Sequence, residues 1–114
     1  MAEYPGDIDR NMRELIRVLN HDLKIRTYES CGGHRNLSGR VNPRPRGEFY
    51  VSFVASLVDE EQLSIIREAI RQFVGKVVLE DHHCYWTISG KGVTPSAFAS
   101  TLTKENRKLL GVPH

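Results

Sequence analysis

Residues 49–79 have the sequence FYVSFVASLVDEEQLSIIREAIRQFVGKVVL, in which the spacing of the apolar residues changes twice. In residues 49–55 apolar side chains alternate, with Phe49, Val51 and Phe53 on one side, which is typical of a strand. The spacing then becomes helical, with an apolar stripe formed by Leu63, Ile66, Ala69, Ile70 and Phe73. A further strand begins at Val77. This succession predicts a sheet that carries a helix.

The limits of the central helix are also marked in the sequence. Asp59 followed three residues later by Gln62 is a capping-box pattern, which predicts the N-terminus of the helix at Asp59. Gly75 stands where a glycine commonly ends a helix.

The flanking sequence supplies the remaining elements. Apolar spacing predicts a helix over residues 8–19, alternation predicts a strand over 24–30, and a hairpin through 81–83 is expected to join strands beginning at Val77 and Cys84. Thr94-Pro95 begins a last helix that Gly111 and Pro113 end, with a break expected at Thr103. The order is α-β-β-α-β-β-α, which predicts an α+β fold with a mainly antiparallel four-stranded sheet and three helices.

The sheet has two faces, and the placement of the helices decides whether the second face is exposed and able to bind a partner. If all three helices lie on one face, the other can display Tyr28, Tyr50 or Tyr85. Such a face suits a second copy of the chain, giving a homo-oligomer, or the stacking of nucleic-acid bases. The alternative is that the third helix covers it.

Length and composition indicate one globular domain over residues 1–114. Apolar residues make up 39% and charged residues 26% of the 114 positions. No apolar run approaches the ~18 residues of a membrane span, and residues 1–9 lack the form of a signal peptide. A cytoplasmic protein with no membrane partner, and with Cys31 and Cys84 as free thiols, is therefore expected.

Positive charge is concentrated in one region, although the net charge is only +2. Residues 24–46 hold six basic residues and one acid, and most of the bases fall in a long loop at 31–48 with two prolines and several glycines. Long loops in small domains are often functional. A basic loop attracts phosphates or nucleic acid, and the alternative is a solvated loop without a ligand.

The loop begins with a distinctive turn, Ser30-Cys31-Gly32-Gly33-His34. Glycines at a strand exit allow positive φ angles and bring backbone N–H groups towards a bound anion. The sequence thus predicts a module that binds an anionic ligand, RNA or a nucleotide. Its candidate ligand-binding residues are Ser30, Gly32, Gly33, Arg35, Arg40, Arg44 and Arg46, with Tyr28 and Tyr50 as base-stacking residues. The alternative is a structural turn around a buried cysteine.

Two other chemistries stay open. Cys31 would be a nucleophile if His34 or another histidine lowered the pKa of its thiol, which would make the protein a cysteine-dependent enzyme. Zinc is the other candidate cofactor, because Cys31, His34, Cys84 and either His82 or His83 form a set of thiolate and imidazole ligands. A structural or oligomer-forming domain is the third alternative.

Ser30-Cys31-Gly32-Gly33 resembles the Ser-Cys-x-Gly signature of the tRNA wybutosine-synthesizing protein 3 family, methyltransferases that act on a modified guanosine in tRNA. The layout is similar over about residues 25–90, where a strand, a helix with acids at its start and a strand pair follow the turn. His34 stands where that family has arginine, and small prokaryotic and phage proteins of unknown role have a similar Ser-Cys-x-Gly-His turn. The resemblance implies an RNA-modifying activity and Ser30, Cys31 and Gly33 as site residues.

Overall fold

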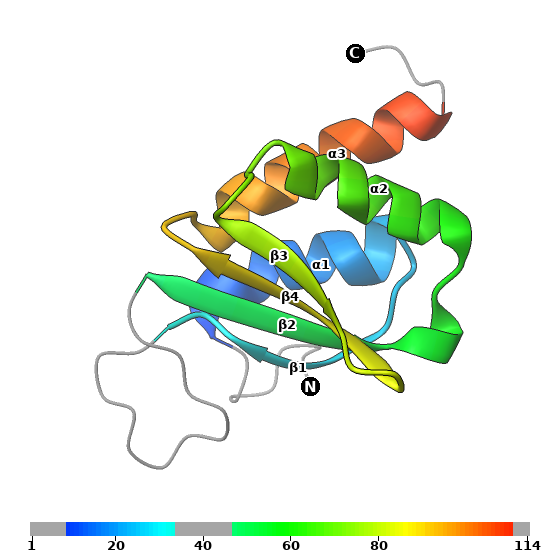
Figure 1. Ribbon diagram of the computed structural model, residues 1–114. Coiled ribbons are helices and arrows are strands. Elements are labelled where there is room, and N and C mark those ends of the chain that lie inside the picture. The colour runs from blue at the N-terminus through cyan, green and yellow to red at the C-terminus, as the bar shows by residue number, and fades with distance from the viewer. Residues whose placement is uncertain (1–8, 34–46, 111–114) are drawn as a thin grey trace.

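The structure is a computed structural model that describes residues 9–33 and 47–110 (Figure 1). A first helical segment is made of η1 (Arg10–Met12), α1 (Arg13–Arg17) and η2 (Val18–Asp22). The strands are β1 (Thr27–Cys31), β2 (Glu48–Val54), β3 (Val77–Asp81) and β4 (Tyr85–Lys91). A short turn η3 (Ala55–Leu57) precedes α2 (Glu60–Arg71), and α3 (Pro95–Leu110) follows the last strand.

The four strands form one antiparallel sheet in the order β1-β2-β4-β3. Pairing of Val51 with Ile88 lies near the centre of the sheet, and Ser30 pairs with Val51 on the other side. All three helices lie on one face of the sheet (Figure 1), so α3 does not cover the other face. The α+β class and the order α-β-β-α-β-β-α are confirmed.

The central helix begins where the sequence predicts, but its last helical residue is Arg71, and a turn follows it up to Gly75. The Asp59 carboxylate accepts a hydrogen bond from the Gln62 N–H, and the Gln62 side chain accepts one from the Asp59 N–H. The Gln62 amide also donates to the Leu23 carbonyl at 2.7 Å, which ties α2 to the segment before β1. Gly75 has a φ of +81°, which a residue with a side chain rarely adopts.

The first helical segment differs from its prediction at both ends. It begins at Arg10 among the described residues and continues to Asp22 through a π-helical turn, whereas the expected end was residue 19. Asn20 belongs to this continuation, and its side-chain oxygen accepts hydrogen bonds from the N–H and hydroxyl of Thr27. The predicted apolar stripe is confirmed, with these residues buried: Met12, Leu15, Ile16, Leu19 and Leu23.

Two further expectations are wrong. The first strand begins at Thr27 and not at residue 24, because Lys24 takes a φ of +61° and the Ile25 N–H bonds back to Leu19. The last helix is not broken at Thr103, whose hydroxyl donates to the Ala99 carbonyl within a continuous α3. Gly111 and Pro113 lie outside the described residues.

Phe49 joins the sheet to the helices, and a glycine makes room for it. Its ring lies 6.5 Å from that of Phe98 on α3, centroid to centroid. Gly90 pairs with Phe49 across β2 and β4, and a Cβ atom at Gly90 would overlap the Phe49 ring. This glycine is therefore required by packing, since its own φ is not positive.

We predict that Gly90→Ala lowers the free energy of unfolding by about 1–3 kcal/mol, the usual range for overpacking a core. Urea denaturation followed by circular dichroism measures this loss. Lys91→Ala, at the exposed neighbouring position, is the control and is expected to change stability by less than about 0.5 kcal/mol. Equal effects of the two changes would contradict the packing role of Gly90.

Candidate functional site

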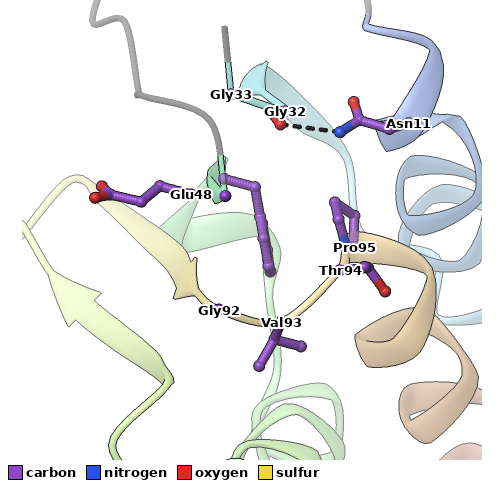
Figure 2. Close-up of a pocket in the computed structure, with 10 residues that line it drawn as sticks. Asn11, Gly32, Gly33, Glu48, Gly92, Val93, Thr94 and Pro95 are labelled. Atoms are coloured by element: carbon purple, nitrogen blue, oxygen red, sulfur yellow. Dashed lines mark hydrogen bonds between the residues drawn. The ribbon is translucent and has the colours of Figure 1, made fainter. Parts of the chain in front are cut away.

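A pocket of about 450 Å³ lies at one end of the sheet (Figure 2). The exit of β1, the entry of β2 and the N-terminus of α3 meet there, and Asn11 closes one side. Four glycines line it, and we call this part of the molecule the glycine end. The lining residues are Asn11, Gly32, Gly33, Gly47, Glu48, Phe49, Gly92, Val93, Thr94 and Pro95.

The Cys-Gly turn is anchored by two residues from the first helical segment. The Gly32 N–H donates to the Asp9 carboxylate at 2.7 Å, and the Asn11 side chain donates to the Gly32 carbonyl at 2.9 Å (Figure 2). A Cβ atom at Gly32 would collide with the Asn11 side chain. Glycine at this position therefore lets Asn11 keep its hydrogen bond to the Gly32 carbonyl without shifting.

The other wall of the pocket is the start of α3. The Thr94 hydroxyl accepts a hydrogen bond from the Ala97 N–H at 3.1 Å and caps the helix. The first turn of α3 contains no acidic residue, so no carboxylate on the helix itself offsets the positive end of its dipole. The positive end of the α3 dipole therefore makes this wall suited to negative charge.

Glycines with positive φ shape the rim of the pocket. Gly33, Gly47 and Gly92 have φ angles of +92°, +89° and +76°, and the Gly92 N–H donates to the Gly47 carbonyl at 2.9 Å. Glu48 is the acidic residue of the lining, and Figure 2 shows its side chain extending away from Thr94 and Pro95. The inner part of the pocket is thus formed by backbone, Phe49 and the α3 terminus.

The structure brings together only part of the predicted ligand site. Gly32 and Gly33 line the pocket, whereas Ser30 lies further along β1, opposite Val51. Cys31 is 4% exposed and is not part of the lining, so its thiol is not presented to a ligand there. The remaining candidates from the loop lie outside the described residues: His34, Arg35, Arg40, Arg44 and Arg46.

The two tyrosines proposed for base stacking behave differently. Tyr50 is only 3% exposed, so the expectation that it is displayed is wrong. Tyr28 is 54% exposed but lies at the opposite end of the sheet from the pocket. Neither ring therefore belongs to the glycine end.

The proposed zinc ligands are not brought together. Cys31 pairs with Tyr50, whereas the Cys84 carbonyl bonds to Ala55, five residues further along the chain. Five strand residues span about 16 Å, so one tetrahedral ion cannot take both thiolates. The same separation places Cys31 far from the hairpin that holds His82 and His83. Within the described ranges, no group of three or more His, Cys, Asp or Glu residues has the geometry to hold a metal ion.

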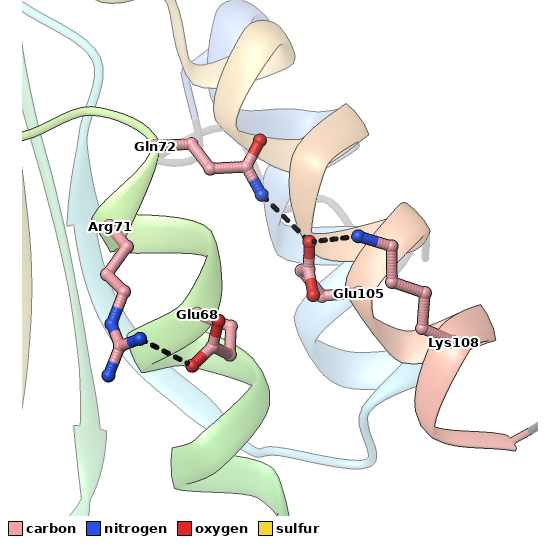
Figure 3. Close-up of polar contacts among 5 residues, drawn as sticks. All are labelled: Glu68, Arg71, Gln72, Glu105 and Lys108. Atoms are coloured by element: carbon pink, nitrogen blue, oxygen red, sulfur yellow. Dashed lines mark hydrogen bonds and ion pairs between the residues drawn. The ribbon is translucent and has the colours of Figure 1, made fainter.

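A second polar cluster lies between α2 and α3 (Figure 3). The Glu105 carboxylate, 10% exposed, accepts hydrogen bonds from Gln72 at 2.8 Å and from Lys108 at 3.2 Å. On α2, Arg71 pairs with Glu68 at 3.4 Å. The Gln72–Glu105 hydrogen bond links the two helices, whereas the other two pairs lie within one helix each. Because each of these groups has a partner, the cluster offers no site.

The sequence alone did not identify Asp9 and Asn11 as site residues. Each contacts Gly32 across more than twenty positions of the chain, and such non-local hydrogen bonds leave no periodic pattern. For Thr94 and Gly92, the sequence indicated only a helix cap and the end of a strand.

Among residues 9–33 and 47–110, no helix has the length and apolar character needed to cross a membrane.

Comparison of the chain with protein-family models, with curated proteins and with solved structures finds no match. The likeness of residues 30–33 to a tRNA-modifying family therefore stays a prediction, and the site has to be interpreted from its own geometry.

The close approach of Asn11 to Gly32 can be tested with a double-mutant cycle. We predict that Gly32→Ala costs about 0.5–1.5 kcal/mol in the native background, because the new methyl group displaces the Asn11 amide and breaks its hydrogen bond to the Gly32 carbonyl. In an Asn11→Ala background the same change should be nearly neutral, since the obstacle is gone. Urea denaturation of the four proteins gives the coupling energy. An equal cost of Gly32→Ala in both backgrounds would show that Asn11 is not what excludes a side chain.

Proposed function

We propose that this protein is a small binding module whose pocket at the glycine end holds an anionic ligand, either a nucleotide or a phosphate group of RNA. The observation that carries this proposal is the meeting of four glycines with the N-terminus of α3 in one pocket of about 450 Å³. Small-molecule pockets usually have about 300–1,000 Å³.

The Cys-Gly turn already accommodates a negative group. The Gly32 N–H donates to a carboxylate oxygen of Asp9, so one donor of the turn is used within the chain. A ligand would therefore meet the neighbouring backbone at Gly33 and Gly92 and the start of α3. The start of α3 contributes the positive end of a helix dipole to the wall, which favours an anion over a neutral ligand.

The chain connects four arginines directly to the pocket. Residues 34–46 run between Gly33 and Gly47, both of which line it, and this segment contains Arg35, Arg40, Arg44 and Arg46 but no acidic residue. Both residues that flank this basic segment thus belong to the pocket, so the proposal assigns its four arginines to the ligand. They would supply phosphate contacts, which carry most of the affinity of proteins for nucleic acid.

The cysteine-dependent enzyme has less support from the geometry. A nucleophile must reach its substrate, and the buried Cys31 does not line the pocket. A binding role is the better explanation of a pocket formed largely by backbone.

Binding of a labelled oligouridylate and of ADP, measured by filter binding and by calorimetry across a salt series, tests the proposal. We expect affinity for the RNA to fall as salt rises, because binding to phosphates releases counterions. Replacing Arg35, Arg40, Arg44 and Arg46 by glutamine should flatten the logarithmic slope by about 0.7 for each phosphate that the variant no longer neutralises. Negligible binding of both ligands at low salt would refute the proposal.

A charge placed in the pocket gives a sharper test. Thr94→Asp keeps a good helix cap but adds a carboxylate to the lining, and we expect it to weaken ligand binding at least about fivefold by repulsion. Ser96→Asp adds the same charge two residues further on, outside the lining, and is the matched control with a smaller expected effect. If the two variants bind equally, the ligand does not occupy this pocket.

A further inference from the structure

The sheet has two edge strands, β1 and β3 (Figure 1). An edge strand presents backbone N–H and C=O groups that can pair with another chain. The β1 edge is interrupted, because the register of β1 with β2 shifts between Thr27 and Glu29. In contrast, β3 pairs with β4 without any shift from Val77 to Asp81. The outer side of β3, which we call the β3 edge, is therefore the regular edge of the sheet.

Two hydrogen bonds at the ends of β3 show which of its backbone groups face outward. The Lys91 N–H donates to the Lys76 carbonyl at 2.8 Å, and the His82 N–H donates to the Tyr85 carbonyl at 2.9 Å. Hydrogen-bonded pairs alternate along an antiparallel ladder. The even-numbered residues of 76–82 therefore point their backbone groups towards β4, and the odd-numbered residues of β3 point theirs outward.

The outward groups in the middle of β3 are available for pairing. The Val77 N–H is used within the chain, since it donates to the Phe73 carbonyl at 3.0 Å. The Val77 carbonyl and both backbone groups of Leu79 have no hydrogen-bond partner in residues 9–33 and 47–110. The β3 edge thus presents three neighbouring groups that another strand can satisfy.

The side chains of the β3 edge alternate between the two faces of the sheet. Val77 is 2% exposed and belongs to the core under the helices, whereas Val78 is 48% exposed on the helix-free face. Lys76 and Glu80, two residues to either side of Val78, lie on the same face because alternate residues of a strand share a face. Along this face the edge is therefore basic, apolar and acidic in turn.

Both charges of this pattern can take a partner. Lys76 is exposed and forms no ion pair within the described part of the chain. Glu80 is also exposed, and its contacts with the Ser89 hydroxyl at 3.3 Å and with His82 Nε2 at 4.0 Å both use Oε1. The second carboxylate oxygen of Glu80 is left to accept from a cation.

We propose that β3 pairs with β3 of a second copy of this chain, antiparallel about a two-fold axis at Val78, so that two four-stranded sheets become continuous. In this register the two Val78 side chains lie opposite each other, and Lys76 lies opposite Glu80 of the second copy at both ends. The Leu79 N–H of each copy faces the Val77 carbonyl of the other. The edge is thus complementary to itself in shape, charge and backbone pairing.

The charges distinguish this register from its neighbours. Centring the pair on Glu80 would set two carboxylates opposite each other, and centring it on Leu79 would set Lys76 opposite His82. The self-complementary pattern favours a second copy over an unrelated strand. Neither Lys76, Val78 nor Glu80 lines the pocket at the glycine end, so this proposal and the proposed function are independent.

Sedimentation equilibrium of the full chain over a concentration series tests the proposal. We expect a dimer with a Kd tighter than about 1 mM. Lys76→Glu and Glu80→Lys each set like charges opposite each other at both ends of the pair, and each should weaken the dimer at least about tenfold. The double variant Lys76→Glu/Glu80→Lys exchanges the charges and should restore the native Kd to within about threefold.

Lys104→Glu makes the same charge change at an exposed position of α3 and is the control, with an unchanged Kd expected. Circular dichroism checks that each variant is folded. A chain that stays monomeric up to about 1 mM, or a double variant as weak as the single variants, would overturn the proposal. In ¹⁵N spectra the Leu79 amide should shift with protein concentration, and shifts confined to Tyr28 and Tyr85 would also overturn it, because they would place the contact on the helix-free face.

Discussion

The antiparallel pairing of β2 with β4 is the constraint on which the other parts of this molecule depend. Seven consecutive pairs run from Glu48–Lys91 to Val54–Tyr85. This register places Phe49 and Ile88 under the helices, and it places the glycines and the tyrosines at opposite ends of the sheet. A shift of one residue would turn every side chain of a strand to the other face. The pocket at the glycine end would then be lost with the core.

Local signals in the sequence predicted the elements well, and non-local contacts explain what they missed. The Asp59–Gln62 capping box and Gly75 mark the start of α2 and the end of the turn that follows it, because each acts within a few residues of itself. The start of β1 was misplaced because Lys24 takes a positive φ where the chain turns back on Leu19, and alternation alone cannot show that. The register with which β2 pairs with β1 and β4 likewise cannot be predicted from the sequence of any one strand.

The candidate site was predictable in the same partial way. Glycines at a strand exit indicated a turn suited to an anion, and Gly32 and Gly33 do line a pocket. The chemistry of cysteine and histidine suggested a zinc site or a catalytic thiol, but the sequence does not show how far apart these side chains lie in the fold. The register places Cys31 and Cys84 far apart along β2, and Cys31 is buried. What the structure adds is the α3 terminus, which comes from a segment more than sixty residues away in the chain.

The central claim is that an anion occupies the pocket at the glycine end. Amide chemical shifts of the ¹⁵N-labelled protein, recorded while ADP is added, test it most directly because each backbone N–H reports its own surroundings. The account predicts shifts that saturate together at Gly33, Gly92 and the first turn of α3, with Tyr85 unaffected. Shifts confined to residues outside the pocket, or saturating nowhere, would contradict it.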